Sequence, residues 1–245
     1  MKYLKEFSTE SEYLTYRDGA DYLKPNVSLL DDKGEVYYNF TPPIVYEAVD
    51  LGLPSGTKWA AQNVGARKPS DAGLYFQWGD ISGYSANQVG TGDGKKKFSS
   101  DWSDYKWNPS GDGETFTKYT TPGATLELED DAAHANMGGD WHMPTFKQFK
   151  ELTANTTISW TTLNGVSGNT FTSKKDGTKS IFIPAAGNAW GGEIVVSDYS
   201  YFWFPELSYR QVSGGQYFYF TPNSIGSYSD YIPRSRGYSI RGVIG

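Results

Sequence analysis

The spacing of hydrophobic residues predicts two helices near the middle of the chain. The apolar residues of 146–154 recur at every third position, and Thr145 with Gln148 matches a capping box, so we expect an amphipathic helix there. A second helix is expected over 130–137, because good helix formers follow a cluster of acids and Gly138 can end the helix. Both helices are short, so most of the remaining chain must fold as strands and loops.

Short apolar or alternating runs bounded by Gly, Pro, Asn and Ser predict strands before and after these helices. In 216–220 tyrosines alternate with phenylalanines, as in a strand with one buried face. Helices in the middle with strands on either side indicate an α+β domain. The predicted strands are 49–53, 58–60, 158–160, 171–173, 180–183, 201–204, 216–220 and 239–243.

The first residues have a pattern of their own. A capping box predicts a helix over 10–18, and two strand-like runs, 27–30 and 35–38, flank a turn-rich connection and predict a hairpin. A Thr-Pro-Pro sequence then disfavours helix and indicates a stiff linker. We therefore expect an N-terminal unit over 1–43 and a main domain over 44–245.

Residues 82–121 are the least regular part of the main domain. Glycines alternate there with Ser, Asn, Asp and Lys, a composition typical of loops. We expect long surface loops that Trp102, Tyr105 and Trp107 fix to the core.

Charge and composition exclude several classes of protein. The net charge of −6 and the absence of a basic stripe argue against nucleic acid as a partner. The chain has no cysteine, which excludes disulfides, thiolate metal sites and thiol nucleophiles. No apolar run approaches the roughly 18 residues that span a membrane, and the charged first ten residues do not match a signal peptide. We expect neither membrane insertion nor signal-directed secretion.

Aromatic residues are concentrated in the last quarter of the chain. Residues 188–245 hold fourteen aromatic side chains and no lysine, and most other positions are Ser, Gly, Asn, Gln or Pro. Antibody paratopes use this mixture, because Tyr and Trp give large contact areas while small polar residues give adaptable hydrogen bonds. Two interpretations are open: these aromatics form a binding face, or they fill the core of a β-rich domain.

Signatures of common catalytic sites are absent from the sequence. It contains neither a Gly-x-Ser-x-Gly elbow nor a Gly-x-x-x-x-Gly-Lys loop. The acids Glu127, Glu129, Asp130 and Asp131 could supply paired carboxylates, but helix capping accounts for their position. We expect no enzymatic activity and name no catalytic residue.

Metal-ligand patterns are equally weak. His134 and His142 lie eight residues apart without cysteine, which does not match a zinc site, so structural histidines are expected. Asn108 and Asp112 begin like a calcium loop, but Tyr119 stands where an EF-hand needs Glu. We expect no cofactor and no metal site, and calcium in the Asp-bearing loops stays an open alternative.

Seven motifs in a fixed order carry a family resemblance. They are VDLGLPSGTKWA at 49–60, NVGA at 63–66, YFQWG at 75–79, DDAAHAN at 130–136, GGDWHMPT at 138–145, FIPAAG at 182–187 and GYSIR at 237–241. Together they resemble the Fibrobacter succinogenes-type major paralogous domain, a family similar to C-type-lectin-like folds. The resemblance implies an α+β domain with two helices, small antiparallel sheets and long irregular loops.

The chain departs from this family at several positions. Gln62 stands where family members often have Cys, and His142 stands where they often have Arg. Between residues 186 and 237 the resemblance is poor apart from Trp203, which matches the usual buried tryptophan. Both diversification of this segment and ordinary loop drift would produce such a difference.

The resemblance also implies a function. Domains of this layout display ligand-binding surfaces, and related domains occur in tail-associated proteins of phages of gut Bacteroides, where some are variable targets of diversity-generating retroelements. We therefore expect a non-enzymatic phage-tail adhesin in the virion, or else a cell-surface protein. The implied partners are a bacterial surface glycan or protein receptor, further virion proteins at the N-terminal unit, and a second copy in a homo-oligomer.

The resemblance and the strand alternation divide the aromatic segment into two sets. Trp203, Phe218, Phe220, Ile240 and Val243 are expected in the core. In the alternative hypothesis the chain is a structural particle protein, and its aromatic C-terminal face is a subunit interface. The expected outward-facing, ligand-binding residues are Asn188, Trp190, Tyr199, Tyr201, Phe204, Glu206, Tyr209, Gln216, Tyr217, Tyr219, Tyr228, Asp230, Tyr231 and Arg236.

Overall fold

The chain divides into two compact units, residues 1–45 and 46–245. In the first unit β1 (Val27–Leu30) pairs antiparallel with β2 (Val36–Phe40), which confirms the predicted hairpin strands. The helix predicted over 10–18 lies outside the described residues. The computed structural model describes residues 27–30, 36–40, 43–195, 198–224 and 227–245, with backbone alone for 27–30, 36–40 and 227–230.

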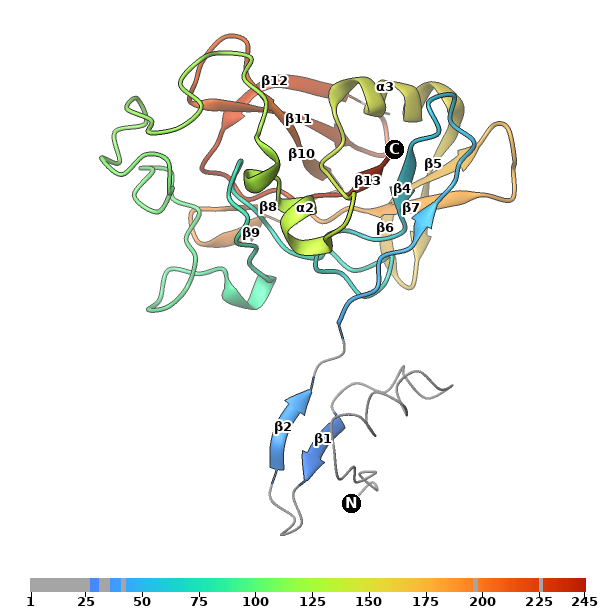
Figure 1. Ribbon diagram of the computed structural model, residues 1–245, viewed down its shortest axis with the longest axis horizontal. Coiled ribbons are helices and arrows are strands. Elements are labelled where there is room, and N and C mark those ends of the chain that lie inside the picture. Colours follow the sequence, from blue (N-terminus) through green and yellow to red (C-terminus); the bar gives the residue numbers. More distant parts are fainter. Residues whose placement is uncertain (1–26, 31–35, 41–42, 196–197, 225–226) are drawn as a thin grey trace. The chain divides into compact units, whose positions relative to one another are not determined.

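The second unit is a mixed α+β structure, as predicted (Figure 1). Helix α3 (Phe146–Asn155) begins at a capping box: the Thr145 side chain accepts from the Gln148 N–H, and the Gln148 side chain accepts from the Thr145 N–H. Helix α2 (Ala132–Met137) starts two residues later than predicted. A short 3-10 helix, Leu128–Asp130, precedes it, so the sequence pattern combined two elements into one.

Asp131 fixes the start of α2. Its carboxylate accepts hydrogen bonds from the N–H groups of Ala133 at 2.8 Å and His134 at 3.0 Å. It also accepts from the N–H of Met143 at 2.7 Å, which ties the helix to the chain leading into α3. The side chain is only 5% exposed, so three backbone donors in the core depend on this one carboxylate.

Replacing Asp131 with alanine is expected to lower the free energy of unfolding by about 2–3 kcal/mol, because buried donors lose a charged acceptor. Urea denaturation measures the loss. Asp93, exposed in a loop, supplies the control: Asp93→Ala should change stability by less than about 0.5 kcal/mol. Equal effects of the two substitutions would contradict this role of Asp131.

The strands form small antiparallel sheets, and the described segments near both ends of the second unit meet in one of them. Val243 in β13 (Val243–Ile244) pairs with Trp59 in β4 (Lys58–Ala60), and β3 (Ala48–Val49) pairs with the other edge of β4. The other sheets are β5 (Thr156–Leu163) with β6 (Val166–Ser173) and β7 (Ser180–Pro184); β8 (Asn188–Trp190) with β9 (Glu193–Val195); and β10 (Ser200–Leu207) with β11 (Gly214–Phe220) and β12 (Ser227–Pro233).

Most predicted strands are present, but two of the predictions are too long. The strand expected over 49–53 is regular only at its start, and the one expected over 239–243 forms only β13 and an isolated bridge from Ser239 to Phe202. Strands β8, β9 and β12 were not predicted. The first two are three residues long and carry no clear alternation.

The core lies on both faces of the β10–β11–β12 sheet. On one face Phe202 and Phe218 pack with Phe149 of α3; on the other, Trp203 packs with Trp78 and with Ala133 of α2. The five predicted core residues are confirmed, since each is at most 1% exposed. They are Trp203, Phe218, Phe220, Ile240 and Val243.

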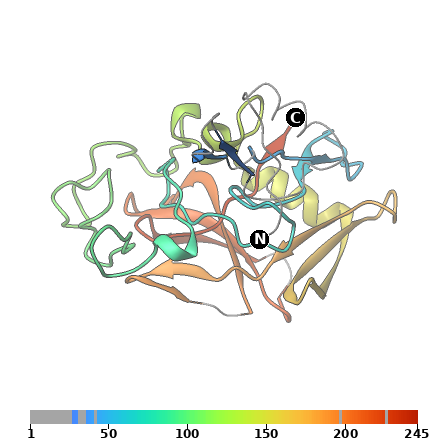
Figure 2. The ribbon, with the colours of Figure 1, turned by 90° about the horizontal axis from the view of Figure 1, so that it is seen from below.

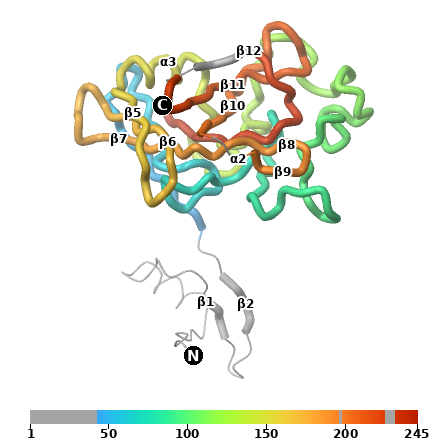
Figure 3. The backbone as a smooth tube through the Cα atoms, turned by 180° about the vertical axis from the view of Figure 1, so that it is seen from behind, coloured from blue at the N-terminus to red at the C-terminus, as the bar shows by residue number. Residues whose placement is uncertain are grey.

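Residues 82–121 form irregular loops at one end of the unit, and the β5–β7 sheet lies at the opposite end (Figure 1, Figure 2 and Figure 3). Tyr105 fixes these loops as predicted: it is buried, and its hydroxyl donates to the Trp78 carbonyl at 2.8 Å. The sequence did not indicate the second anchor. The fully buried Arg234 guanidinium lies 3.8 Å from the centre of the Phe116 ring.

Candidate functional site

The β10–β11 pair carries tyrosines on one face and phenylalanines on the other. Tyr201 lies opposite Tyr219, and Phe202 lies opposite Phe218. Successive side chains of a strand alternate between its faces, so the register places all the tyrosines of these strands on the face that does not contact α3. The phenylalanine face is completely buried and forms a packed support for the tyrosines.

Four tyrosines form a continuous surface that we call the tyrosine face: Tyr199, Tyr201, Tyr217 and Tyr219. The Tyr199 and Tyr201 rings are nearly parallel, with centroids 5.6 Å apart. Across the strands Tyr201 lies 6.1 Å from Tyr219 and 6.2 Å from Tyr217. Tyr199 is 39% exposed and the other three are half-buried, so each ring is held by its neighbours and still meets solvent.

Tyr238 forms the floor beneath this face. Its ring stacks on Tyr201 at 5.1 Å and on Trp203 at 4.5 Å. The Trp203 indole and the Tyr238 N–H both donate to the Phe76 carbonyl, at 2.8 and 3.0 Å. Sequence analysis placed Tyr238 in a family motif but did not assign it this supporting role. The floor is therefore fixed by hydrogen bonds as well as by packing.

Arg236 and Trp190 border the tyrosine face. The Arg236 guanidinium lies 4.3 Å from the centre of the Trp190 ring, and its charge opposes the burial that raises the pKa of Tyr238. Burial raises the pKa of Tyr201, and the nearby Arg236 charge opposes this shift. Six of the fourteen predicted residues are thereby brought together: Trp190, Tyr199, Tyr201, Tyr217, Tyr219 and Arg236.

Three residues predicted to point outward are buried. Phe204 is inaccessible to solvent because α3 covers this face, with Phe149 at 5.5 Å. Gln216 is 3% exposed, because it shares the covered face of β11 with Phe218, and its side chain donates to the Leu207 carbonyl at 2.9 Å. Asn188 is 6% exposed in β8. The prediction of outward orientation was wrong for all three.

Glu206, which was predicted to face outward and bind ligand, instead forms a hydrogen bond with the first residue of α3. One carboxylate oxygen accepts from the N–H of Phe146, the first residue of α3, at 3.2 Å. Burial raises the pKa of this carboxyl group. Its position at a helix N-terminus indicates that it stabilises α3 through the helix dipole.

The remaining predicted residues lie away from the tyrosine face or outside the described side chains. Tyr209 is 70% exposed in the β10–β11 connection and lies against Gly123. Tyr231 is 37% exposed and lies against Gly214 at the start of β11. For Tyr228 and Asp230 the backbone of β12 is described, but not the side chains.

Among the described residues, three neighbouring acids before α2 could hold a metal ion: Glu127, Glu129 and Asp130. All three form ion pairs with Lys118. The Lys118 ammonium is 2.6 Å from Glu127, 2.9 Å from Glu129 and 2.6 Å from Asp130. These hydrogen bonds raise the pKa of Lys118. Helix capping, the role expected for all four acids, therefore applies to Asp131, whereas the other three bind Lys118.

In the loop that begins like a calcium site, Asn108 and Asp112 form hydrogen bonds within the loop itself. The Asn108 side chain donates to Asp112 at 2.9 Å and to the Thr115 carbonyl at 2.7 Å, while Asp112 accepts from the Thr115 N–H. The two histidines also have backbone contacts: the His134 ring lies 3.3 Å from the Trp141 carbonyl, and the His142 ring 2.9 Å from that of Met143.

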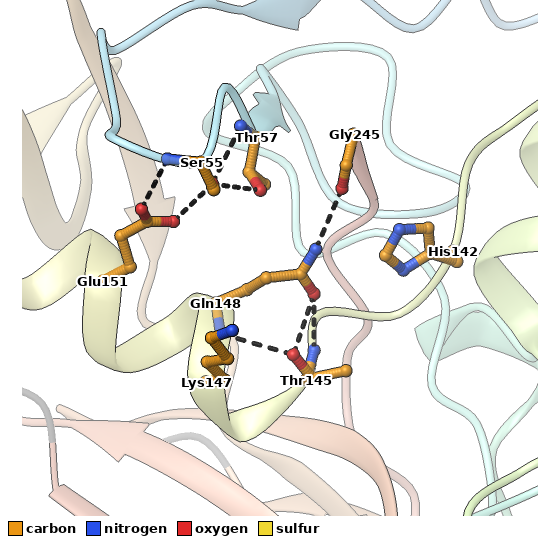
Figure 4. A pocket seen from close by; sticks show the side chains of 8 residues that line it. All are labelled: Ser55, Thr57, His142, Thr145, Lys147, Gln148, Glu151 and Gly245. Carbon is orange, nitrogen blue, oxygen red and sulfur yellow. Dashed lines mark hydrogen bonds between the residues drawn. The ribbon is translucent and has the colours of Figure 1, made fainter.

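A separate pocket of about 360 Å³ lies beside α3 (Figure 4). Its polar groups bond to one another: Glu151 accepts twice from Ser55, and Gln148 donates to the Gly245 carbonyl at 3.2 Å. These bonds connect α3 to the turn before β4 and to the end of β13. The pocket is lined by Ser55, Thr57, His142, Thr145, Lys147, Gln148, Glu151 and Gly245.

Comparison with known proteins found no matching family model, no matching curated protein and no matching solved structure. Within the described residues no helix is long and apolar enough to cross a membrane. The geometry of the chain's own residues therefore carries the functional argument.

Proposed function

We propose that this chain is a non-enzymatic binding protein that presents the tyrosine face to a ligand on a bacterial surface. The observation that carries the proposal is the contrast between the two faces of β10 and β11. Phe202 and Phe218 are fully buried, while Tyr201 and Tyr219, opposite each other on the other face, meet solvent. Tyrosines fixed in this way give contact area with little conformational entropy left to lose, as binding surfaces require.

A C-type-lectin-like fold is the finer part of the proposal. Its support is the agreement of the sequence motifs with two helices, small antiparallel sheets and long irregular loops. Trp203, which the sequence resemblance matches to the family's usual buried tryptophan, is inaccessible to solvent. In this proposal the second unit is a scaffold, and the segment 188–236 supplies recognition.

A binding role also agrees with the state of the described polar groups. The acidic group next to α2 binds Lys118, and both histidine rings contact backbone carbonyls. As a phage-tail adhesin, the chain would attach to other virion proteins through residues 1–43 and vary in its tyrosine-bearing segment.

The proposal is tested by incubating the fluorescently labelled full chain with intact cells of a panel of gut bacterial strains. We expect saturable retention on a restricted set of strains, because a shaped tyrosine surface discriminates among ligands. Flow cytometry measures the retention. Absence of retention on every strain, or equal retention on all of them, would count against a specific receptor-binding role.

The subunit-interface hypothesis predicts a different result for the same surface. An obligate interface would keep the tyrosine face covered, so the chain would sediment as an oligomer and Tyr201→Arg would dissociate it. A receptor-binding face predicts that Tyr201→Arg leaves the sedimenting mass unchanged and removes retention on cells. Analytical ultracentrifugation of the full chain and this variant distinguishes the two.

A further inference from the structure

Arg236 is a cation held in place by aromatic rings. Its guanidinium lies over the Trp190 ring at 4.3 Å, and its positive charge opposes the burial that raises the pKa of the nearby Tyr238 hydroxyl, whose ring stacks on Tyr201. Long arginine side chains normally lose much rotamer freedom when they bind. Here the neighbouring rings have already fixed this one, so a ligand would meet a preorganised charge.

This cation lacks an anionic partner among the described side chains. Arg236 belongs to none of the ion pairs formed there, and its Nε atom is buried without a hydrogen-bond acceptor. The two Nη atoms form no hydrogen bond among the described residues and are not buried, so they are the donors that a carboxylate can reach. The chain as a whole is acidic, with a net charge of −6, so the positive charge at Arg236 is local.

The tyrosine face adds hydroxyl groups beside this cation. Within the described part of the chain, the hydroxyls of Tyr199, Tyr201, Tyr217 and Tyr219 form no hydrogen bond, and none is buried without a partner. Solvent therefore reaches them, and each can both donate and accept. A ligand that fits this surface carries many hydroxyls of its own and at least one carboxylate.

We propose, on the basis of the binding function above, that Arg236 and the adjoining Tyr201 form a subsite for the carboxylate of an acidic glycan. The carboxylate accepts from the Arg236 guanidinium, and the neighbouring sugar hydroxyls exchange hydrogen bonds with the tyrosine face. An acidic polypeptide could offer the carboxylate but brings fewer hydroxyls, so it fits the surface less well.

The test follows the Nε–H resonance of Arg236 by NMR in the purified full chain. Acetate, the smallest carboxylate probe, is expected to shift this resonance saturably, and acetamide is not. Trigalacturonate is expected to bind at least tenfold more tightly than both its neutral methyl ester and a triglutamate peptide. No saturable response to acetate would overturn the anion subsite, and tighter binding of triglutamate would replace the glycan with a polypeptide ligand.

A matched pair of variants provides the second readout. Arg236→Gln is expected to weaken trigalacturonate binding by about tenfold or more, the effect of losing one charge-assisted hydrogen bond. Arg210→Gln removes an exposed arginine outside the face and is expected to leave binding unchanged. Equal affinities of these two variants, with both folded by circular dichroism, would contradict the subsite. Should Arg236→Gln not fold, the wild-type titration decides.

These results are separable from those of the cell-retention experiment. If the chain is retained on cells but acetate does not shift the Arg236 resonance, the carboxylate subsite is refuted and the proposed binding function still holds. If acetate shifts the resonance but the chain is retained on no strain, the carboxylate subsite is supported and the receptor-binding role is refuted.

Discussion

Replacing Trp203 with alanine is expected to lower the free energy of unfolding by about 3–5 kcal/mol, the range for truncating a buried tryptophan. Trp203 is inaccessible to solvent and packs between Trp78 and Tyr238. Its indole N–H donates to the Phe76 carbonyl at 2.8 Å, so the substitution removes a hydrogen bond together with the packing.

Equilibrium denaturation in guanidinium chloride measures this loss. Trp190→Ala provides a matched control, because Trp190 is half-buried at the edge of the tyrosine face. We expect that substitution to cost less than about 2 kcal/mol. A loss of less than about 1 kcal/mol for Trp203→Ala would contradict its position at the centre of the core.

The same substitution should loosen the tyrosine face. Tyr238 stacks on Trp203 and supports Tyr201, so a cavity below Tyr238 allows both rings to move. Stability and recognition are therefore linked through one column of aromatic side chains, and the order of the binding surface depends on the core beneath it.

The sequence pattern predicted the orientation of side chains where one face of a strand is open. In β11 the alternation of Tyr217, Phe218, Tyr219 and Phe220 matched the structure, because burial follows the two-residue period of a strand. The same reasoning was wrong for Phe204. Both faces of β10 are covered there, and no feature within the strand indicates that α3 packs against it.

Other differences arise from contacts between residues far apart in the chain. Gln216 lies on the same face of β11 as the buried Phe218, and its polar side chain is accommodated there by a hydrogen bond to the Leu207 carbonyl. No sequence pattern indicated that Arg234 is buried, yet its guanidinium lies over the rings of Tyr105 and Phe116 from the loops of 82–121. Sequence spacing cannot predict such long-range contacts.

The outward orientation of several single site residues could be inferred from the sequence, but their contacts with one another could not. Trp190, Tyr201 and Arg236 were each expected to point outward, and the structure places Arg236 over Trp190 and stacks Tyr201 on Tyr238. The pairing of Ala189 with Gly237 brings β8 beside the chain that carries Arg236. This contact between distant segments, rather than any local motif, assembles the border of the tyrosine face.

Replacing Tyr201 and Tyr219 together with serine is expected to weaken ligand binding at least about a hundredfold. Aromatic residues at the centre of an interface commonly contribute 2 kcal/mol or more each, and about 2.8 kcal/mol corresponds to a hundredfold change. The two rings are cross-strand neighbours 6.1 Å apart and lie at the middle of the tyrosine face. Since both are half-buried on a packed sheet, the variant should stay folded, which its thermal midpoint checks.

The chain offers a control of identical composition in Tyr209 and Tyr231, two exposed tyrosines outside the tyrosine face. The decisive measurement is the dissociation constant of each double serine variant on cells of a strain that retains the unmodified chain. We expect a loss of at least about a hundredfold for the Tyr201 and Tyr219 variant and less than about threefold for the Tyr209 and Tyr231 variant. Equal losses for the two variants, or unchanged binding by a folded Tyr201 and Tyr219 variant, would contradict it.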